Sequence, residues 1–197
     1  MISEELLNKI RTFAQELMPP DDLHGWGHIL RVVDLCEEIA HEELCDGNLL
    51  QAAALLHDVG RGIEKEPVNQ GKHHAELSEE LAIPFLAEIG IDSEEIGAII
   101  NCIRGHSFSA GAAPEGIEAQ ILSDADKLDA MGAIGIYRMA LYQAPANRGM
   151  RGFAEHLDEK LLRLKDLLFT ETARSLAEPR HALLVAYREE IKREFKF

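Results

Sequence analysis

Apolar residues recur every three or four positions along most of the chain, the spacing that places one face of a helix against a core. No segment shows a clear strand pattern of alternating apolar and polar residues. We expect the helix over 73–88 to be kinked or interrupted at Pro84, and the last helix to bend near Pro179. The pattern predicts an all-α fold with helices over about residues 3–18, 28–40, 48–59, 73–88, 93–106, 117–131, 153–169 and 171–194.

The segment 48–59 is apolar on nearly all sides, which is typical of a helix buried on nearly all sides. We therefore predict that it is the central helix. It ends in His57 and Asp58, followed by Val59 and Gly60. Adjacent helical residues point about 100° apart, so His57 and Asp58 cannot both lie flat against the core. They can bracket one ion beside the helix end, although a capped, solvated helix end explains the dipeptide alone equally well.

Other metal-capable side chains also lie near the ends or edges of apolar segments. His28 is at the edge of the apolar stripe of the second helix, His74 is at the start of the helix over 73–88, and His106 is where the next helix meets a glycine. Asp124 lies on or beside the apolar face of the helix over 117–131, where a carboxylate is costly unless it is paired or holds a metal. In a helical bundle, such positions can converge on one point.

Two nearby carboxylates, Asp126 and Asp129, lie off that apolar face and are predicted to be solvated. A set of imidazoles and carboxylates suits Mn, Fe, Co, Ni or Zn better than Ca, and Mg is also compatible. The absence of cysteine from the set argues against a structural zinc site.

Polar or small residues separate the predicted helices at three places, residues 61–72, 107–116 and 144–152. In the first loop, Glu64 and Glu66 either orient water beside a site or are ordinary surface acids. The third loop is locally basic because it carries Arg148 and Arg151.

Composition narrows the functional classes. The formal net charge of −15 argues against nucleic acid as an electrostatically held partner. The three cysteines, an odd number with no CxxC pair, favour reduced thiols, and we expect each to be a small core residue in a helix. No apolar run approaches the roughly 18 residues of a membrane span, and the N-terminus is acidic where a signal peptide is basic. We expect a cytoplasmic protein with no membrane partner.

Five segments, taken in their order along the chain, resemble the HD-domain superfamily of metal-dependent phosphohydrolases. HGWGHILRV (24–32), AALLHDVGR (53–61) and ILSDADKLDA (121–130) are similar to its ligand-bearing helices. HLDEKLL (156–162) and TETAR (170–174) are similar to its small single-domain bacterial branch, the YpgQ/YedJ-like proteins. The resemblance implies one HD domain over 1–197, with a core over about 20–143 and an antiparallel helical pair over about 153–196 packed on it.

The resemblance also implies site residues. It makes four residues ligands of one divalent ion, namely His28, His57, Asp58 and Asp124. His74 and His106 match histidines that hold a second ion in some members and touch phosphate in others, so one or two ions remain open. The separate GYP segment of cyclic-dinucleotide phosphodiesterases is missing, which counts against that activity.

Cations are needed around a leaving phosphate group. Lys127 is the first choice because it lies three residues after Asp124 in one helix; the weaker candidates are Arg61, Arg148 and Arg151. His156 and Lys160 share a helix face and either border the site or are structural. Asp58 is expected to take part in catalysis as a metal ligand. The general acid is expected to be His106 or a loop glutamate such as Glu64.

The expected function is metal-dependent hydrolysis of nucleotides, most specifically of a nucleoside triphosphate to monophosphate and pyrophosphate. A 5′-nucleotidase, a dinucleoside polyphosphate hydrolase and an alarmone hydrolase are the alternatives with the same chemistry. A non-catalytic metal or nucleotide sensor is the alternative from another class. The sequence leaves open whether the chain is a monomer or a homodimer.

Overall fold

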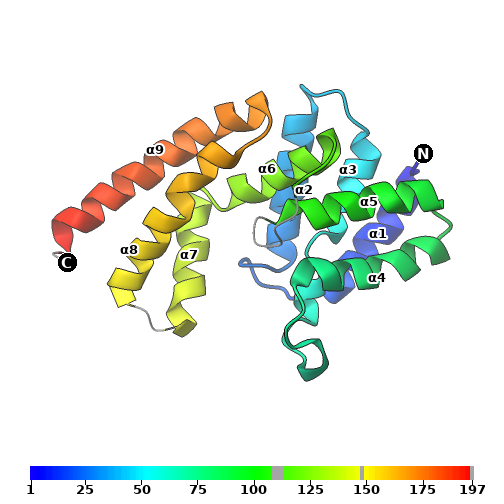
Figure 1. The fold of residues 1–197 in the computed structure, drawn as a ribbon, viewed down its shortest axis with the longest axis horizontal. Coiled ribbons are helices and arrows are strands. Elements are labelled where there is room, and N and C mark those ends of the chain that lie inside the picture. Colours follow the sequence, from blue (N-terminus) through cyan, green and yellow to red (C-terminus); the bar gives the residue numbers. More distant parts are fainter. Residues whose placement is uncertain (108–112, 147–148, 196–197) are drawn as a thin grey trace. The chain divides into compact units, whose positions relative to one another are not determined.

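The structure is a computed structural model that describes residues 1–107, 113–146 and 149–195. The described residues form helices joined by turns, with no strand among them, which confirms the all-α prediction (Figure 1). The α-helices are α1 (Glu4–Leu17), α2 (Trp26–Ala40), α3 (Gly47–Leu56), α4 (His74–Glu88), α5 (Ser93–His106), α6 (Ile117–Asp129), α7 (Gly132–Ala146), α8 (Gly149–Glu159) and α9 (Glu171–Glu194). Short 3-10 helices are η1 (Val59–Gly62), η2 (Pro67–Asn69) and η4 (Leu161–Leu167).

Contacts divide the chain into two compact units, Met1–Ala125 and Asp126–Phe197. In the first unit α3 is central, since it packs against α1, α2 and α5, while α4 packs against α5 and η1. Figure 1 shows α4 and α5 running side by side. Side chains along α3, such as Leu55 and Leu56, are fully buried. The prediction of a central apolar helix is therefore confirmed.

Local signals set several helix starts in the first unit. The side chains of Ser3, Asp46 and Asp92 accept hydrogen bonds from backbone N–H groups in the first turns of α1, α3 and α5. These bonds satisfy donors that have no partner within the helix. α4 ends before Gly90, whose φ of +86° suits glycine.

Neither proline interrupts its helix, so an interruption at Pro84 is excluded, while a kink at Pro84 and a bend near Pro179 stay predictions. α4 runs through Pro84 and α9 runs through Pro179. A proline removes one helical hydrogen bond, and packing on both sides of it can hold the remaining turns in place.

The predicted loop over 144–152 is wrong at both ends. α7 continues to Ala146 and α8 begins at Gly149, whose φ is +64°; residues 147 and 148 lie outside the described part. The predicted helix over 153–169 ends early, at Glu159, and continues as η4. Glycine and proline content indicated a loop here, but packing among α7, α8, α9 and η4 decides the helix ends in the second unit.

Asp129 is not solvated, contrary to the prediction. It is the last residue of α6 and is 3% exposed, and one of its oxygens lies 2.6 Å from the guanidinium of Arg138 on α7. Arg138 is buried as well. A buried ion pair of this kind depends on a tertiary partner nine residues away, so a helical-wheel argument misses it. Asp126 is half-buried.

A bidentate ion pair joins α8 to α9. Both carboxylate oxygens of Asp158 lie 2.6 Å from nitrogens of Arg188. These hydrogen bonds hold the pKa of Asp158 below its ordinary value of 3.8, which means that they stabilise the ionised form.

Asp158→Asn is therefore expected to lower the free energy of unfolding by about 1 kcal/mol at pH 7. Because the folded-state pKa of Asp158 is depressed, its contribution to the free energy of unfolding is fully present above the ordinary carboxyl pKa. That contribution is lost as the pH falls through the folded-state pKa. Urea titrations of both proteins at several pH values should show the gap closing under acid conditions. An equal gap at pH 7 and below pH 3 would contradict this assignment.

The cysteines differ in environment. Cys36 and Cys102 are buried in α2 and α5, as expected, but Cys45 is half-buried in the turn before α3, so the helical prediction for it is wrong. Burial raises the pKa of the Cys102 thiol to about 12. Burial and the nearby carboxylate of Glu118 also raise the pKa of the Cys45 thiol, but Cys45 is only half-buried. Because the thiolate is the reactive form, a thiol reagent at pH 8 should label Cys45 slowly in the native protein and all three cysteines only after denaturation. Fast native labelling of Cys102 would contradict this burial.

Among the described residues, none of the helices combines the length and the apolar character needed to cross a membrane.

Candidate metal centre

His28 is buried in the first turn of α2. The helix can begin there because Gly25, its N-cap, lies against the chain at Pro19 and Asp21. A Cβ at Gly25 would be too close to the backbone carbonyl oxygens of both residues. The Trp26 N–H also donates to the Pro19 carbonyl at 2.9 Å. The glycine next to the tryptophan thus allows the close approach that aims His28 inward.

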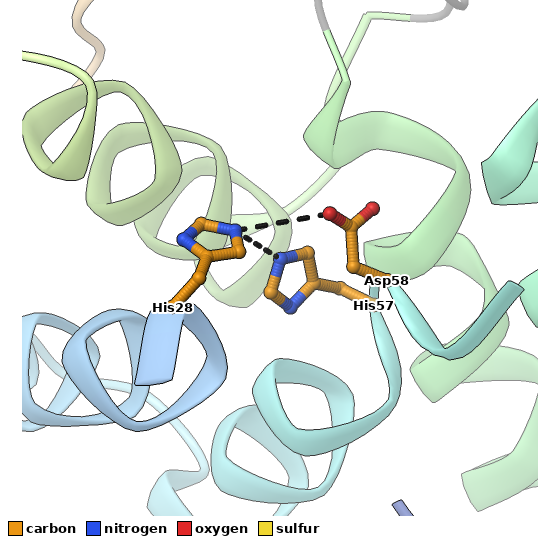
Figure 2. Close-up of side chains that lie close together, drawn as sticks. All are labelled: His28, His57 and Asp58. Atoms are coloured by element: carbon orange, nitrogen blue, oxygen red, sulfur yellow. Dashed lines mark hydrogen bonds and ion pairs between the residues drawn. The ribbon is translucent and has the colours of Figure 1, made fainter. Parts of the chain in front are cut away.

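His57 and Asp58 follow the last residue of α3, and both are buried. The Nε2 atoms of His57 and His28 are 3.3 Å apart, and His28 Nε2 is 3.8 Å from Asp58 Oδ2. Figure 2 shows the His28 ring extending from α2 toward the two side chains at the end of α3. The prediction that side chains far apart in sequence gather at the end of the central helix holds for these three residues.

Hydrogen bonds to the backbone orient two of the rings. His57 Nδ1 lies 2.7 Å from the Ala54 carbonyl, and His106 Nδ1 lies 2.6 Å from the Ile103 carbonyl. Since a carbonyl oxygen only accepts, each Nδ1 carries the hydrogen, and in the neutral ring each Nε2 carries a lone pair. This arrangement is typical of histidines that bind a metal through Nε2.

A second group of side chains that could bind a metal lies around the other oxygen of Asp58. His74, the first residue of α4, places Nε2 3.3 Å from Asp58 Oδ1, and His106, the last residue of α5, places Nε2 3.6 Å from it. Asp58 Oδ1 is buried and has no hydrogen-bond partner. In each group, His28–His57–Asp58 and Asp58–His74–His106, the donor atoms all lie within 4.8 Å of one another. Donor atoms that converge on an unsatisfied buried carboxylate oxygen fit a divalent cation.

The protonation states also suit a cation. Burial raises the pKa of Asp58, but the neighbouring His106 and Arg61 side chains outweigh that effect and hold the pKa well below its ordinary value. Burial, more than any other cause, lowers the pKa of His74 to about 2. At neutral pH the centre therefore holds an ionised carboxylate and a neutral imidazole, which are the forms that bind metals.

Arg61, in η1, borders the second group. Its Nε lies 3.3 Å from Asp58 Oδ2, its Nη1 lies 3.1 Å from Glu64, and its Nη2 lies 3.3 Å from His74 Nε2. Burial lowers the pKa of Arg61, but the Asp58 and Glu64 carboxylates raise it further than that. The sequence indicated Arg61 only as a weak phosphate contact and gave no sign that it would reach His74, 13 residues away.

Gly60 sets the approach of α4 to the centre. Its N–H donates to the Ser78 hydroxyl at 2.9 Å. A Cβ built on Gly60 would overlap the His74 carbonyl and lie 2.6 Å from the Ser78 nitrogen. Ser78 was not predicted to lie near the centre, and the signal for it in the sequence is the glycine at position 60.

Asp124 is fully buried on α6. The neighbouring Ser123 hydroxyl donates to the His106 carbonyl at 3.2 Å, which places this turn of α6 against the end of α5. Asp124 is not a member of either group of converging donors, so its role as a ligand stays a prediction.

The other cations proposed for phosphate belong to the second unit, and their contact with substrate stays a prediction. Lys127 is 6% exposed, and its Nζ lies 5.0 Å from the centre of the Phe169 ring. Arg151 is exposed on α8, and Arg148 lies outside the described residues. On α8 the His156 ring lies 5.7 Å from that of Tyr142.

Comparison with known proteins agrees with this geometry. The family model of the HD domain matches residues 25–131. The chain is 32% identical over 196 residues to the uncharacterized protein YpgQ of Bacillus subtilis (strain 168), covering 94% of this chain and 92% of that protein.

Two solved structures extend the likeness to the fold. The crystal structure of Bacillus subtilis YpgQ in complex with ADP matches with a TM-score of 0.79 and 30% identity, over 100% of this chain and 98% of that one. An HD-superfamily hydrolase from Bacillus thuringiensis matches with a TM-score of 0.73 and 29% identity, over 98% and 97% of the two chains. The chain belongs to the HD-domain family and is a metal-dependent phosphohydrolase of that superfamily.

Proposed function

We propose that the chain hydrolyses nucleotides, and most specifically that it converts a nucleoside triphosphate to a monophosphate and pyrophosphate. The observation that carries the substrate class is the ADP complex of the relative YpgQ, which this chain matches along its whole length. ADP contains the phosphoanhydride bond on which such an enzyme acts. The specificity for triphosphates rests on the resemblance to the YpgQ/YedJ-like branch.

His28, His57 and Asp58 are the residues that would hold the ion, with Asp124 as the fourth ligand. Mixed imidazole and carboxylate donors favour Mn, Fe, Co, Ni or Zn, and Mn is our first choice for assay. When bound, a divalent ion polarises a phosphoryl oxygen and lowers the pKa of a water molecule.

The chain's own residues contribute position and charge. The backbone carbonyls of Ala54 and Ile103 hold His57 and His106 with Nε2 directed toward Asp58. Of the two candidates for general acid, Glu64 is bonded to Arg61, whereas His106 lies within the donor cluster. This difference favours His106 as the general acid. Because its Nδ1 hydrogen is bonded to the Ile103 carbonyl, His106 must first bind a proton at Nε2, which it can then give to the leaving oxygen.

The net charge of −15 repels a polyanionic substrate from most of the surface. Positive charge at the centre must therefore draw the phosphates in, and the ion together with Arg61 supplies it. In phosphoryl transfer such positioning and charge neutralisation account for most of the catalysis.

A metal-by-nucleotide screen with product identification tests the proposal. Metal-free protein is incubated with each ion in turn and with triphosphates, deoxytriphosphates, monophosphates and dinucleoside polyphosphates. We expect pyrophosphate and a nucleoside monophosphate from a triphosphate. Orthophosphate from a monophosphate would point to a 5′-nucleotidase instead, and metal and nucleotide binding without turnover would point to a sensor.

A further inference from the structure

The two donor groups share one carboxylate but use different oxygens of it. Asp58 Oδ2 faces His28, while Asp58 Oδ1 faces His74 and His106. The side chains alone could therefore serve one ion on each side of Asp58. The number of ions depends on what else occupies the second side.

Arg61 already occupies part of that second side. A guanidinium only donates hydrogen bonds, so in its contact with Arg61 Nη2 at 3.3 Å the His74 Nε2 must accept through its lone pair. That lone pair is the one that His74 would offer to a metal. An ion and Arg61 therefore compete for the same atom of His74.

Arg61 is also held from two other directions. Its Nε lies against Asp58 Oδ2, and its Nη1 bonds to Glu64. The guanidinium stays charged at any physiological pH, so it neutralises part of the Asp58 charge, and its Nε contact is to the oxygen that faces His28. On the second side it also occupies the Nε2 lone pair of His74, and this contact distinguishes the second side from the first. Glu64 serves as the anchor of the guanidinium through its bond to Arg61 Nη1.

We propose that Arg61 acts as a built-in cation in the Asp58–His74–His106 group and so limits this chain to one divalent ion, at His28, His57 and Asp58. This inference rests on the proposed metal centre. It assigns Glu64 a positioning role, because its bond to Arg61 Nη1 keeps the guanidinium against His74.

The test counts ions in Arg61→Met, which keeps the apolar stem and removes the charge and the donors. Glu64→Gln is the second variant, since it weakens the anchor and leaves every donor in place. Arg104→Met is the matched control, because Arg104 is exposed and pairs with the half-buried Glu79 in the same unit. Mn²⁺ is counted by equilibrium dialysis with elemental analysis, and electron paramagnetic resonance distinguishes isolated ions from a coupled pair.

We expect one Mn²⁺ in the wild type and in Arg104→Met, and a coupled second Mn²⁺ in Arg61→Met. Loss of a charge-assisted hydrogen bond and of a like charge should tighten the second site by about 10- to 100-fold. Glu64→Gln should show a smaller tightening, and it remains informative if Arg61→Met fails to fold. Two ions in the wild type, or no tightening in either variant, would overturn the role of Arg61 while leaving the proposed function intact. No ion in the wild type would overturn the proposed metal centre itself.

Discussion

Asp58→Asn is expected to abolish metal-dependent hydrolysis, lowering kcat/KM by about a thousandfold or more. The change is nearly isosteric but removes the one carboxylate that both donor groups share. A bound ion supplies several kcal/mol of charge stabilisation in the transition state, and each 1.36 kcal/mol is a factor of ten in rate. Loss of the charge weakens the ion at its site, so metal affinity should fall together with activity.

Asp34→Asn is the matched control for this experiment. Asp34 is exposed on α2 in the same unit, and its replacement should leave both metal affinity and turnover unchanged. Calorimetric titration with Mn²⁺ and steady-state kinetics with a triphosphate give the two readouts. Near-normal turnover by Asp58→Asn would show that the ligand assignment is wrong.

Gly60→Ala is expected to lower the free energy of unfolding by about 3 kcal/mol. The new Cβ would overlap the His74 carbonyl and crowd the Ser78 nitrogen, and both are backbone atoms of α4 that cannot swing aside. The strain is relieved only if α4 moves away from η1. Because His74 is the first residue of α4, such a movement also draws it from Asp58, so the variant should lose part of its metal affinity.

Gly97→Ala gives the contrasting result. Gly97 lies exposed within α5, and a Cβ there meets nothing within 4 Å. Alanine favours a helix over glycine by about 0.5–1 kcal/mol, so this variant should be slightly more stable than the wild type. Denaturant titrations of both variants measure the two effects, and a Gly60→Ala protein as stable as the wild type would refute the close packing of η1 on α4.

The parts of the fold that local chemistry determines could be predicted from sequence. Ser3, Asp46 and Asp92 cap the helices that follow them, because each bonds to N–H groups two or three residues away. The end of α8 and the burial of Asp129 could not be predicted in this way. They depend on partners brought by packing, as the pairing of Asp129 with Arg138 on the next helix shows.

In the candidate site too, some residues could be predicted from the sequence and others depend on tertiary packing. His28 and His57 could be predicted because they lie at the edge or end of strongly apolar segments. The resemblance to a family then matched them, in sequence order, to that family's ligand positions. The contact between Arg61 and His74 could not, because the path of the intervening turn and the approach of α4 at Gly60 determine it. The residue type of Arg61 indicated a cation near phosphate. Its contact with His74, a histidine that could bind a metal, is seen only in the structure.

A crystal structure of the wild-type protein soaked in Mn²⁺, with anomalous data, tests the central claim most directly. We expect one strong anomalous peak within bonding distance of His28 Nε2, His57 Nε2 and a carboxylate oxygen of Asp58. A peak bound by other residues, or no peak after a soak at saturating Mn²⁺, would contradict this prediction.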